Sequence, residues 1–304
     1  MQLSRLAKGY IIAFVGIVFW STTGVIIGYL VTHYKMPALL LAFWRSLFVC
    51  VALVPVIFFV RPALLQIERA QIRFYVFYGL VLAVFNSIWA LSVKANGAAV
   101  ATVLGYSSSG FTAILAFWLF KEKLGLPKMV AVFLSLSGCV MVSNIVSAEM
   151  WRLNPLGIFT GLLTGILFAM YTLIGKEASR QNINPWTSML YSFAFGTVFI
   201  MLFNLFPMLP GAAGSFTALM PNLPIDGWLL LILLSFLPTI LGFGLYNTSM
   251  NYLPASIANL MATLEPALTA VEAYVLLDER MTMLQIAGSI IILSAVVIVQ
   301  FERE

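Results

Sequence analysis

Long apolar stretches constrain the fold of this 304-residue chain more than any other feature. A helix needs about 20 residues to cross ~30 Å of hydrocarbon at 1.5 Å per residue, and we count ten stretches of that length and character. Only 9% of the residues are charged, against about 25% in an ordinary soluble domain, so the polar residues are too few to cover a water-exposed surface. A β-barrel would show shorter segments of alternating hydropathy. The sequence therefore predicts an all-α polytopic membrane protein.

Proline and charged residues mark the ends of the ten predicted membrane spans. Pro37, Pro127, Pro155 and Pro185 each fall at the start of a span, where the N–H that proline lacks would have no partner in any helix. The predicted spans are residues 9–31, 37–60, 72–93, 97–120, 126–146, 155–175, 185–206, 227–250, 254–277 and 282–301.

The Lys and Arg residues are unevenly divided between the two sides that this topology defines. With the N-terminus inside, eleven fall on the inner side and four on the outer side, which is the asymmetry of the positive-inside rule. We therefore expect both termini in the cytoplasm. The inner set is Arg5, Lys8, Arg61, Arg69, Arg73, Lys121, Lys123, Lys128, Lys176, Arg180 and Arg303, and the outer set is Lys35, Lys94, Arg152 and Arg280.

The second half of the chain repeats the first. A shift of 157 residues aligns predicted spans 3–5 with spans 8–10, and a shift of 149 aligns span 1 with span 6. Five spans per half is an odd number, so the halves must cross the membrane in opposite directions, as in many secondary transporters. We predict two inverted five-helix repeats, residues 1–147 and 148–304. The identities include Ser92/Ser249, Ala98/Ala255, Ala101/Ala258, Thr112/Thr269 and Glu122/Glu279, and, for the shorter shift, Gly16/Gly165, Phe19/Phe168 and Thr23/Thr172.

The two halves also share a motif near their ends. A helix with a Pro or Gly is followed about a dozen residues later by an acidic residue, and then by a final helix that contains Gly. The residues that carry this motif are Leu264-Glu265-Pro266-Ala267, Glu279 and Gly288 in the second half, and Ser109-Gly110, Glu122 and Gly138 in the first, with Trp20-Ser21 and Arg45 as further matches. The pattern resembles the EamA family of the drug/metabolite transporter superfamily over essentially the whole chain. The resemblance implies that spans 1, 3, 4, 6, 8 and 9 surround a central cavity and that spans 5 and 10 pack at its rim.

Polar and aromatic side chains concentrate in the spans that would surround such a cavity. Polar groups within a membrane must find partners or face water, and aromatic walls with hydroxyl and amide groups between them suit a small amphipathic solute. The alternative is that the aromatic rings and small hydroxyl residues only pack helices together. The candidate substrate-binding residues are Trp20, Ser21, Asn86, Trp89, Tyr106, Ser109, Tyr171, Tyr246, Asn247 and Asn259.

Three charged residues lie inside predicted spans. Arg45 lies eight residues into span 2, which is ~12 Å deep, and Glu272 lies at a similar depth in span 9, so we expect that these two residues can form an ion pair. Glu265 lies near the middle of span 9. It either binds a cationic group or a coupling proton, or it stabilises helix packing, and the family resemblance favours the structural role.

Kinks are expected where proline interrupts a span. Pro238 in span 8 is followed by Gly242 and Gly244, and Pro266 interrupts span 9. Carbonyl groups that such breaks release next to a cavity can bind a solute.

These features together predict a secondary transporter. We expect it to export amino acids or similar small organic metabolites across the cytoplasmic (inner) membrane of a bacterium by alternating access. The alternatives are a channel-like or sensory membrane protein, or a carrier for drugs, nucleosides or cofactors. An intramembrane enzyme is disfavoured, because the sequence has one His and no HExxH or GxSxG motif. The expected partners are a small-molecule solute and the lipid bilayer, without nucleic acid, metal or cofactor, and a monomer is expected to suffice because one chain carries both halves.

Overall fold

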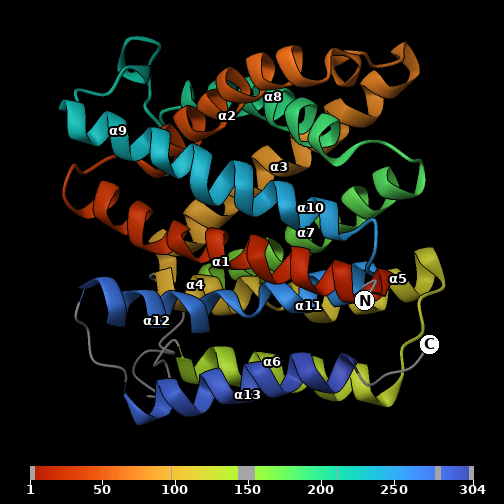
Figure 1. Ribbon diagram of the computed structural model, residues 1–304. Coiled ribbons are helices and arrows are strands. Elements are labelled where there is room, and N and C mark those ends of the chain that lie inside the picture. Colours follow the sequence, from red (N-terminus) through yellow and green to blue (C-terminus); the bar gives the residue numbers. More distant parts are fainter. Residues whose placement is uncertain (1–3, 97, 143–154, 210, 278–281, 301–304) are drawn as a thin grey trace.

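A computed structural model describes residues 4–96, 98–142, 155–209, 211–277 and 282–300 of the chain. These residues form a bundle of helices that run along one common direction, with the start of α1 and the end of α13 near the same end of the bundle (Figure 1). The described residues contain no strand, so the all-α prediction is confirmed. We call the two ends of the bundle the N-terminal end, where α1 begins, and the far end.

Each of the ten predicted ranges contains helix. Seven helical stretches among the described residues are long and apolar enough to cross a membrane, and two of these, Ala101–Phe120 and Ile225–Ser249, combine consecutive shorter segments. Two more apolar helices are shorter, so ten crossings remain a prediction. The helices are α1 Arg5–Thr32, α2 Ala38–Val60, α3 Arg69–Asn96, α4 Ala98–Gly105, α5 Ser108–Phe120, α6 Leu126–Val142, α7 Pro155–Arg180, α8 Pro185–Asn204, α9 Ile225–Leu234, a π-helix η3 at Ser235–Phe243, α10 Gly244–Ser249, α11 Ala255–Ala262, α12 Glu265–Leu277 and α13 Met283–Gln300, with short 3₁₀ turns at Pro62–Leu65 and Thr217–Leu219.

Two of the predicted spans, 97–120 and 254–277, are broken helices. The break in 254–277 lies beside Pro266, where an interruption was expected, whereas no break was expected within 97–120. The first divides into α4 and α5 around Tyr106 and Ser107, and the second divides into α11 and α12 around Thr263 and Leu264. In the second half the break has a clear cause, because Pro266 lies in the first turn of α12 and cannot donate to a preceding turn. The paired segments have 8 and 13 residues in both halves, and the shift of 157 maps one pair onto the other.

The span that contains Pro238 has a widened turn in its middle. Proline at this position leaves the carbonyl group of Leu234 without its helical donor. The hydroxyl group of Thr239 donates to that carbonyl oxygen at 2.8 Å, and the backbone from Ser235 to Phe243 takes π-helical geometry. The expected irregularity is therefore a π-helical segment between α9 and α10.

The pair α6 and α13 packs at one edge of the bundle (Figure 1). Gly138, near the end of α6, contacts Gly288, near the start of α13, so the two helices are antiparallel; a Cβ atom built on Gly288 would lie 2.8 Å from the carbonyl oxygen of Gly138. Ala131 and Ala295 belong to a second contact region of the same pair. The shift of 157 exchanges the two contact regions, as expected for inverted repeats. The predicted boundary between residues 147 and 148, like Glu279, lies outside the described residues.

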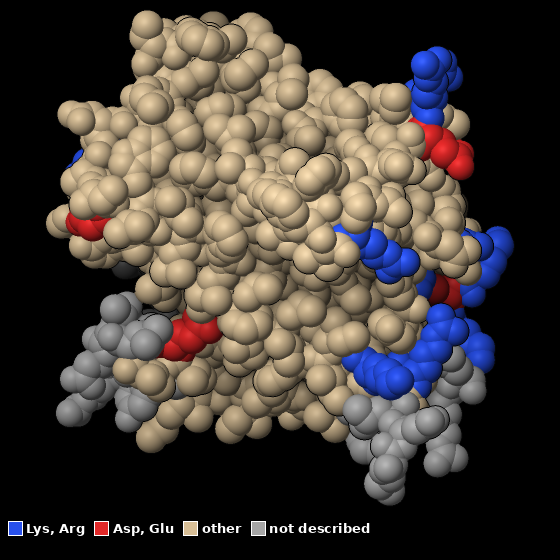
Figure 2. Space-filling view, turned by 45° about the horizontal axis from the view of Figure 1, so that its top comes forward, with Lys and Arg blue, Asp and Glu red and all other residues tan. Residues whose placement is uncertain are grey.

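The surface of the bundle is apolar along its sides and basic at its N-terminal end. Large apolar side chains such as Phe59, Trp118 and Phe133 are exposed along the sides, which is typical of a surface that faces lipid. Figure 2 shows Lys and Arg side chains gathered at one end of the molecule, with few along the sides. The bundle therefore has the surface of a multi-pass membrane protein.

Candidate functional site

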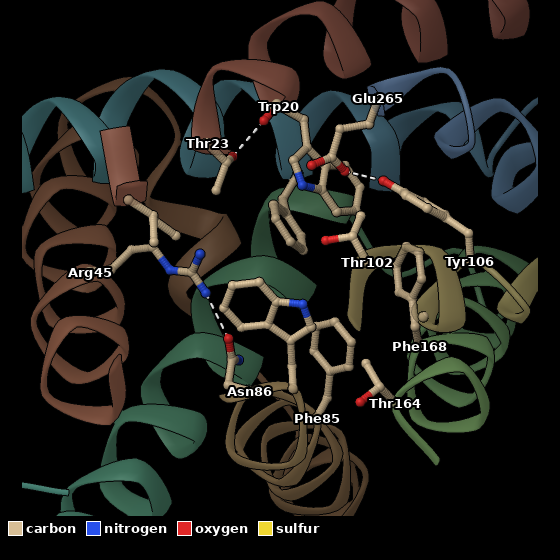
Figure 3. Close-up of a pocket in the computed structure, with 14 residues that line it drawn as sticks. Trp20, Thr23, Arg45, Phe85, Asn86, Thr102, Tyr106, Thr164, Phe168 and Glu265 are labelled. Carbon is tan, nitrogen blue, oxygen red and sulfur yellow. Dashed lines mark hydrogen bonds between the residues drawn. The ribbon is translucent and has the colours of Figure 1, made fainter. Parts of the chain in front are cut away.

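A cavity of about 110 Å³ lies between the central helices, in the half of the bundle nearer the far end. Its walls come from α1, α2, α3, α4, α7 and η3 and from the first residue of α12, so both halves of the chain contribute. The family resemblance implied that spans 1, 3, 4, 6, 8 and 9 surround the cavity, and all six contribute to its walls. Helix α2, which belongs to span 2, adds Arg45. The lining residues are Trp20, Thr23, Ile27, Arg45, Phe85, Asn86, Trp89, Thr102, Gly105, Tyr106, Thr164, Phe168, Phe243 and Glu265 (Figure 3).

The structure brings six of the predicted site residues to this cavity and places the other seven elsewhere. The six are Trp20, Arg45, Asn86, Trp89, Tyr106 and Glu265. The seven that do not line it are Ser21, Ser109, Tyr171, Tyr246, Asn247, Asn259 and Glu272.

One wall of the cavity carries a buried cation. Arg45 is 8% exposed, and its Nη2 donates to Oδ1 of Asn86 at 2.8 Å (Figure 3). Asn86 is fixed in turn, because its Nδ2 donates to the carbonyl oxygen of Leu82 one turn earlier in α3. The backbone of α2 is held at the same point, where the hydroxyl group of Ser235 donates to the carbonyl oxygen of Arg45 at 3.1 Å.

Another wall carries a carboxylate. Glu265 is the first residue of α12, and its Oε2 accepts a hydrogen bond from the hydroxyl group of Tyr106. The break in the first half thus places Tyr106 opposite the break in the second half.

The predicted ion pair between Arg45 and Glu272 is wrong. Glu272 accepts a hydrogen bond from the hydroxyl group of Ser21 at 2.5 Å, whereas Arg45 bonds to Asn86. The reason is the position of the helices: α12 packs against α1, and α2 packs against α8, η3 and α9. Equal depth in the membrane did not bring the two side chains to one place.

Several of the remaining predicted residues form a buried polar network nearer the N-terminal end. Asn247 donates to the hydroxyl group of Tyr171 at 3.2 Å, and Tyr246 shares a hydrogen bond of 2.9 Å with Thr172. Asn259 joins the network to the first half, because it donates to Thr172 and accepts from Ser108, both at 2.9 Å. Ser109 only bonds to the carbonyl oxygen of Tyr106, within its own helix turn.

An aromatic layer separates the cavity from this network. The ring centroid of Trp20 lies 4.1 Å from that of Phe243, 5.3 Å from that of Tyr246 and 5.7 Å from that of Phe168. The four rings come from α1, α7, η3 and α10, so the layer crosses the middle of the bundle. It divides the polar residues into two groups, one on each side.

The N-terminal end of the bundle is closed by hydrogen bonds to the loop between α10 and α11 and to the first residues of α11. The carboxylate of Glu122 accepts from the backbone N–H of Ala255 at 2.7 Å and from the hydroxyl group of Ser256. Nζ of Lys176 donates to the carbonyl oxygens of Met250 and Leu253 at 2.8 and 2.7 Å. These contacts tie α5 and α7 to the start of α11.

Some cavity residues were missed by sequence reasoning, although helical spacing carries a signal for two of them. Phe85 lies four residues before Trp89, and Thr102 lies four residues before Tyr106, so each shares a helix face with a predicted residue. Thr164 and Phe168 share a face of α7 with each other, but no predicted residue of α7 lines the cavity, so spacing gave no signal for them. Helical spacing gave no signal for Phe243, because the direction of its side chain depends on the π-helical segment.

A cavity between two related helical halves, lined by aromatic and charged side chains, defines a class of protein: a membrane transporter of small solutes. Two segments of the chain, residues 7–144 and 155–301, match the model of the EamA-like transporter family. The chain therefore belongs to the EamA-like transporter family.

Named relatives of this chain are transporters. A probable amino-acid metabolite efflux pump of Escherichia coli is 25% identical over 295 residues, which cover 96% of this chain and 94% of that protein. An uncharacterized transporter of Synechocystis is 27% identical over 228 residues, which cover 74% of this chain and 65% of that protein, less than two thirds of its length. One crystal structure of a protein with 13% sequence identity shares the fold, with a TM-score of 0.79 over 96% of both chains.

Proposed function

We propose that this protein is a secondary transporter that exports amino acids or similar small organic metabolites across the bacterial inner membrane by alternating access. The observation that carries the proposal is the cavity between the two halves, where Arg45 and Glu265 extend from different walls among aromatic side chains (Figure 3). Such a site suits a small solute with both charged and apolar parts. The name of the Escherichia coli relative supports the same substrate class.

The two ends of the bundle differ in how closely the helices are joined, and this difference supports alternating access. The cavity lies toward the far end, whereas Glu122 and Lys176 hold the N-terminal end closed. In the opposite state these hydrogen bonds break and the aromatic layer around Trp20 opens. The polar network of Tyr171, Asn247 and Asn259 then becomes the floor of a cavity that faces the N-terminal end.

The orientation in the membrane follows from charge. The N-terminal end carries Lys and Arg residues of α1, α6 and α7, of the start of α3 and of the segment between α5 and α6, so the positive-inside rule assigns it to the cytoplasm (Figure 2). The cavity of this structure then lies toward the outer face. Because the sequence contains no GxxxxGK[ST] phosphate-binding loop, we infer that ion or solute gradients drive transport.

Transport by the purified protein in proteoliposomes tests the proposal. We expect saturable uptake of at least one labelled amino acid, and faster uptake when the vesicles are preloaded with the same unlabelled amino acid, because a carrier exchanges solute through one site. A flux that is linear in concentration and shows no such exchange would indicate a channel. No flux of any of the twenty amino acids, while nucleosides or drugs are carried, would assign the protein to another substrate class.

A further inference from the structure

The charge of Arg45 lacks a counter-charge among the residues that the structure describes. Its one described hydrogen bond from the guanidinium group goes to the neutral amide of Asn86, and its buried Nε has no hydrogen-bond partner among the described residues. In the described part of the chain the single ion pair joins Glu177 and Arg180 on the surface. A cation inside a membrane protein is costly unless it is paired or hydrated, so this site is suited to an anion.

The carboxylate of Glu265 has the opposite character. Tyr106 donates a hydrogen bond to Oε2, and no Lys or Arg of the described residues lies within ion-pair distance. Figure 3 shows the side chains of Arg45 and Glu265 on different sides of the cavity, with both charged groups directed toward the space between them. The cavity thus has a positive pole and a negative pole.

We propose that the cavity binds a zwitterion, with the carboxylate of the solute at Arg45 and Asn86 and its ammonium group at Glu265 and Tyr106. This inference rests on the proposed transport function and names the feature of the solute that the site recognises. Each charged group of the solute supplies the counter-charge that Arg45 or Glu265 lacks among the described residues. Neither a simple amine nor a simple carboxylic acid does this for both poles.

The geometry of Arg45 suits a carboxylate. A guanidinium group offers planar pairs of N–H donors that match the two oxygens of a carboxylate, and here its position is fixed before binding. Asn86 holds Nη2 from one side, and Ser235 holds the backbone of α2 from another. A solute carboxylate therefore meets a donor group that loses little freedom on binding.

The aromatic walls of the cavity can pack against the side chain of a bound amino acid. Phe85 and Phe168 stack with ring centroids 5.6 Å apart, and Trp89 lines the same cavity. Apolar side chains are favoured next to such rings. Among zwitterions, the site therefore favours amino acids with apolar or aromatic side chains over those with a charged side chain.

The first test uses the unmodified protein and needs no substitution. Binding and proteoliposome transport are measured for L-phenylalanine and L-leucine, each beside its methyl ester, which keeps only the ammonium charge, and its N-acetyl derivative, which keeps only the carboxylate. We expect each one-charge derivative to bind about 10- to 100-fold more weakly than the parent, because one charge-assisted contact is lost.

Two variants test which protein side chain binds each charged group of the solute. In Arg45→Gln the preference for the amino acid over its methyl ester should collapse, while the methyl ester binds as before. In Glu265→Gln the preference over the N-acetyl derivative should collapse instead. Glu272→Gln is the matched control, because Glu272 lies on the same helix and bonds to Ser21 rather than lining the cavity. If Arg45→Gln does not fold, Asn86→Ala keeps the positive charge but removes the amide that positions it, and should weaken binding of the two carboxylate-bearing compounds only.

The outcomes separate the two proposals. Saturable transport of an amino acid with equal binding of its methyl ester and N-acetyl derivative would overturn the zwitterion site and leave the transport function standing. Binding with the expected preferences but no transport would overturn the function and leave the site standing. Failure of every amino acid to bind or cross would overturn both.

Discussion

A single aromatic residue can separate the binding role of the cavity from the packing role of the bundle. Trp89 lines the cavity, whereas Trp118 is 71% exposed on the side of the bundle. We expect Trp89→Ala to raise the KM for transport roughly 10-fold, because a wall contact worth about 1–2 kcal/mol is lost. Trp118→Ala should leave KM unchanged. Transport kinetics in proteoliposomes, at matched protein content, provide the measurement, and an equal loss in both variants would contradict a specific role of Trp89.

The candidate site shows what a sequence can and cannot say about single residues. The sequence identified the polar residues inside spans, but not the direction in which each one points. Trp20 and Ser21 are neighbours, yet one turns toward the cavity and the other bonds to Glu272, because successive residues of a helix differ by about 100° in direction. Direction depends on the packing of distant helices, and that packing also decided the partner of Arg45.

At the scale of elements, Glu122 is predicted to hold the N-terminal end closed. Its carboxylate binds the start of α11 through Ala255 and Ser256. Glu122→Gln keeps the size of the side chain but removes its charge, and charge-assisted hydrogen bonds weaken accordingly. We expect backbone amides of residues 250–256 to exchange hydrogen about 10-fold faster in this variant, as measured by hydrogen–deuterium exchange with mass spectrometry.

Glu177→Gln is the matched control for this experiment. It removes the same charge at the same end of the bundle, but Glu177 contacts Arg180 and Gln181 rather than the loop before α11. Exchange of residues 250–256 should stay at the level of the unmodified protein. Equal acceleration in both variants would show that the loop is protected by the negative charge at this end of the bundle, and not by the contact of Glu122 with α11.

The crossing of α6 and α13 gives a prediction about stability. A Cβ atom on Gly138 would lie 2.6 Å from a side-chain carbon of Ile292 and 2.8 Å from the carbonyl oxygen of Gly288, so a larger residue forces the helices apart. We expect Gly138→Val to cost about 1–3 kcal/mol and to lower the melting temperature in detergent by about 5 °C. Gly28→Val is the control, because nothing lies within 4 Å of its Cβ position. A similar melting temperature for both variants would contradict a tight crossing.

Much of the element pattern was predictable, and its exceptions have local causes. Apolar runs and prolines located the helices, and the repeat was visible in the sequence. Pro238 and Pro266 indicated where helices become irregular, although only the structure distinguishes a π-helical segment from a break. The break at Tyr106 has no proline. It became recognisable only through its equivalence to the break beside Pro266, because the two halves keep the same segment lengths.

For the whole molecule, the packing of the two related halves supports the proposal of alternating access. The contacts Gly138–Gly288 and Ala131–Ala295 are exchanged by the repeat, so the pair α6–α13 lies about the pseudo-twofold axis and its packing need not change. The cavity, in contrast, is asymmetric. The repeat equivalent of Trp89 is Tyr246, and only Trp89 lines the cavity in this state. A rim that keeps its packing around an asymmetric centre is the arrangement that the proposed alternating access would use.

A labelling experiment decides the orientation of the bundle in the membrane. Lys123 is exposed in the segment between α5 and α6 at the N-terminal end, and Ser215 is exposed in the segment between α8 and α9 at the far end. In a background where Cys50 and Cys139 are replaced by Ala, we expect Ser215→Cys to react with a membrane-impermeant maleimide in intact cells. Lys123→Cys should react only after the membrane is permeabilised. The reverse pattern would place the N-terminal end outside, and the cavity of this structure would then face the cytoplasm as an inward-facing state.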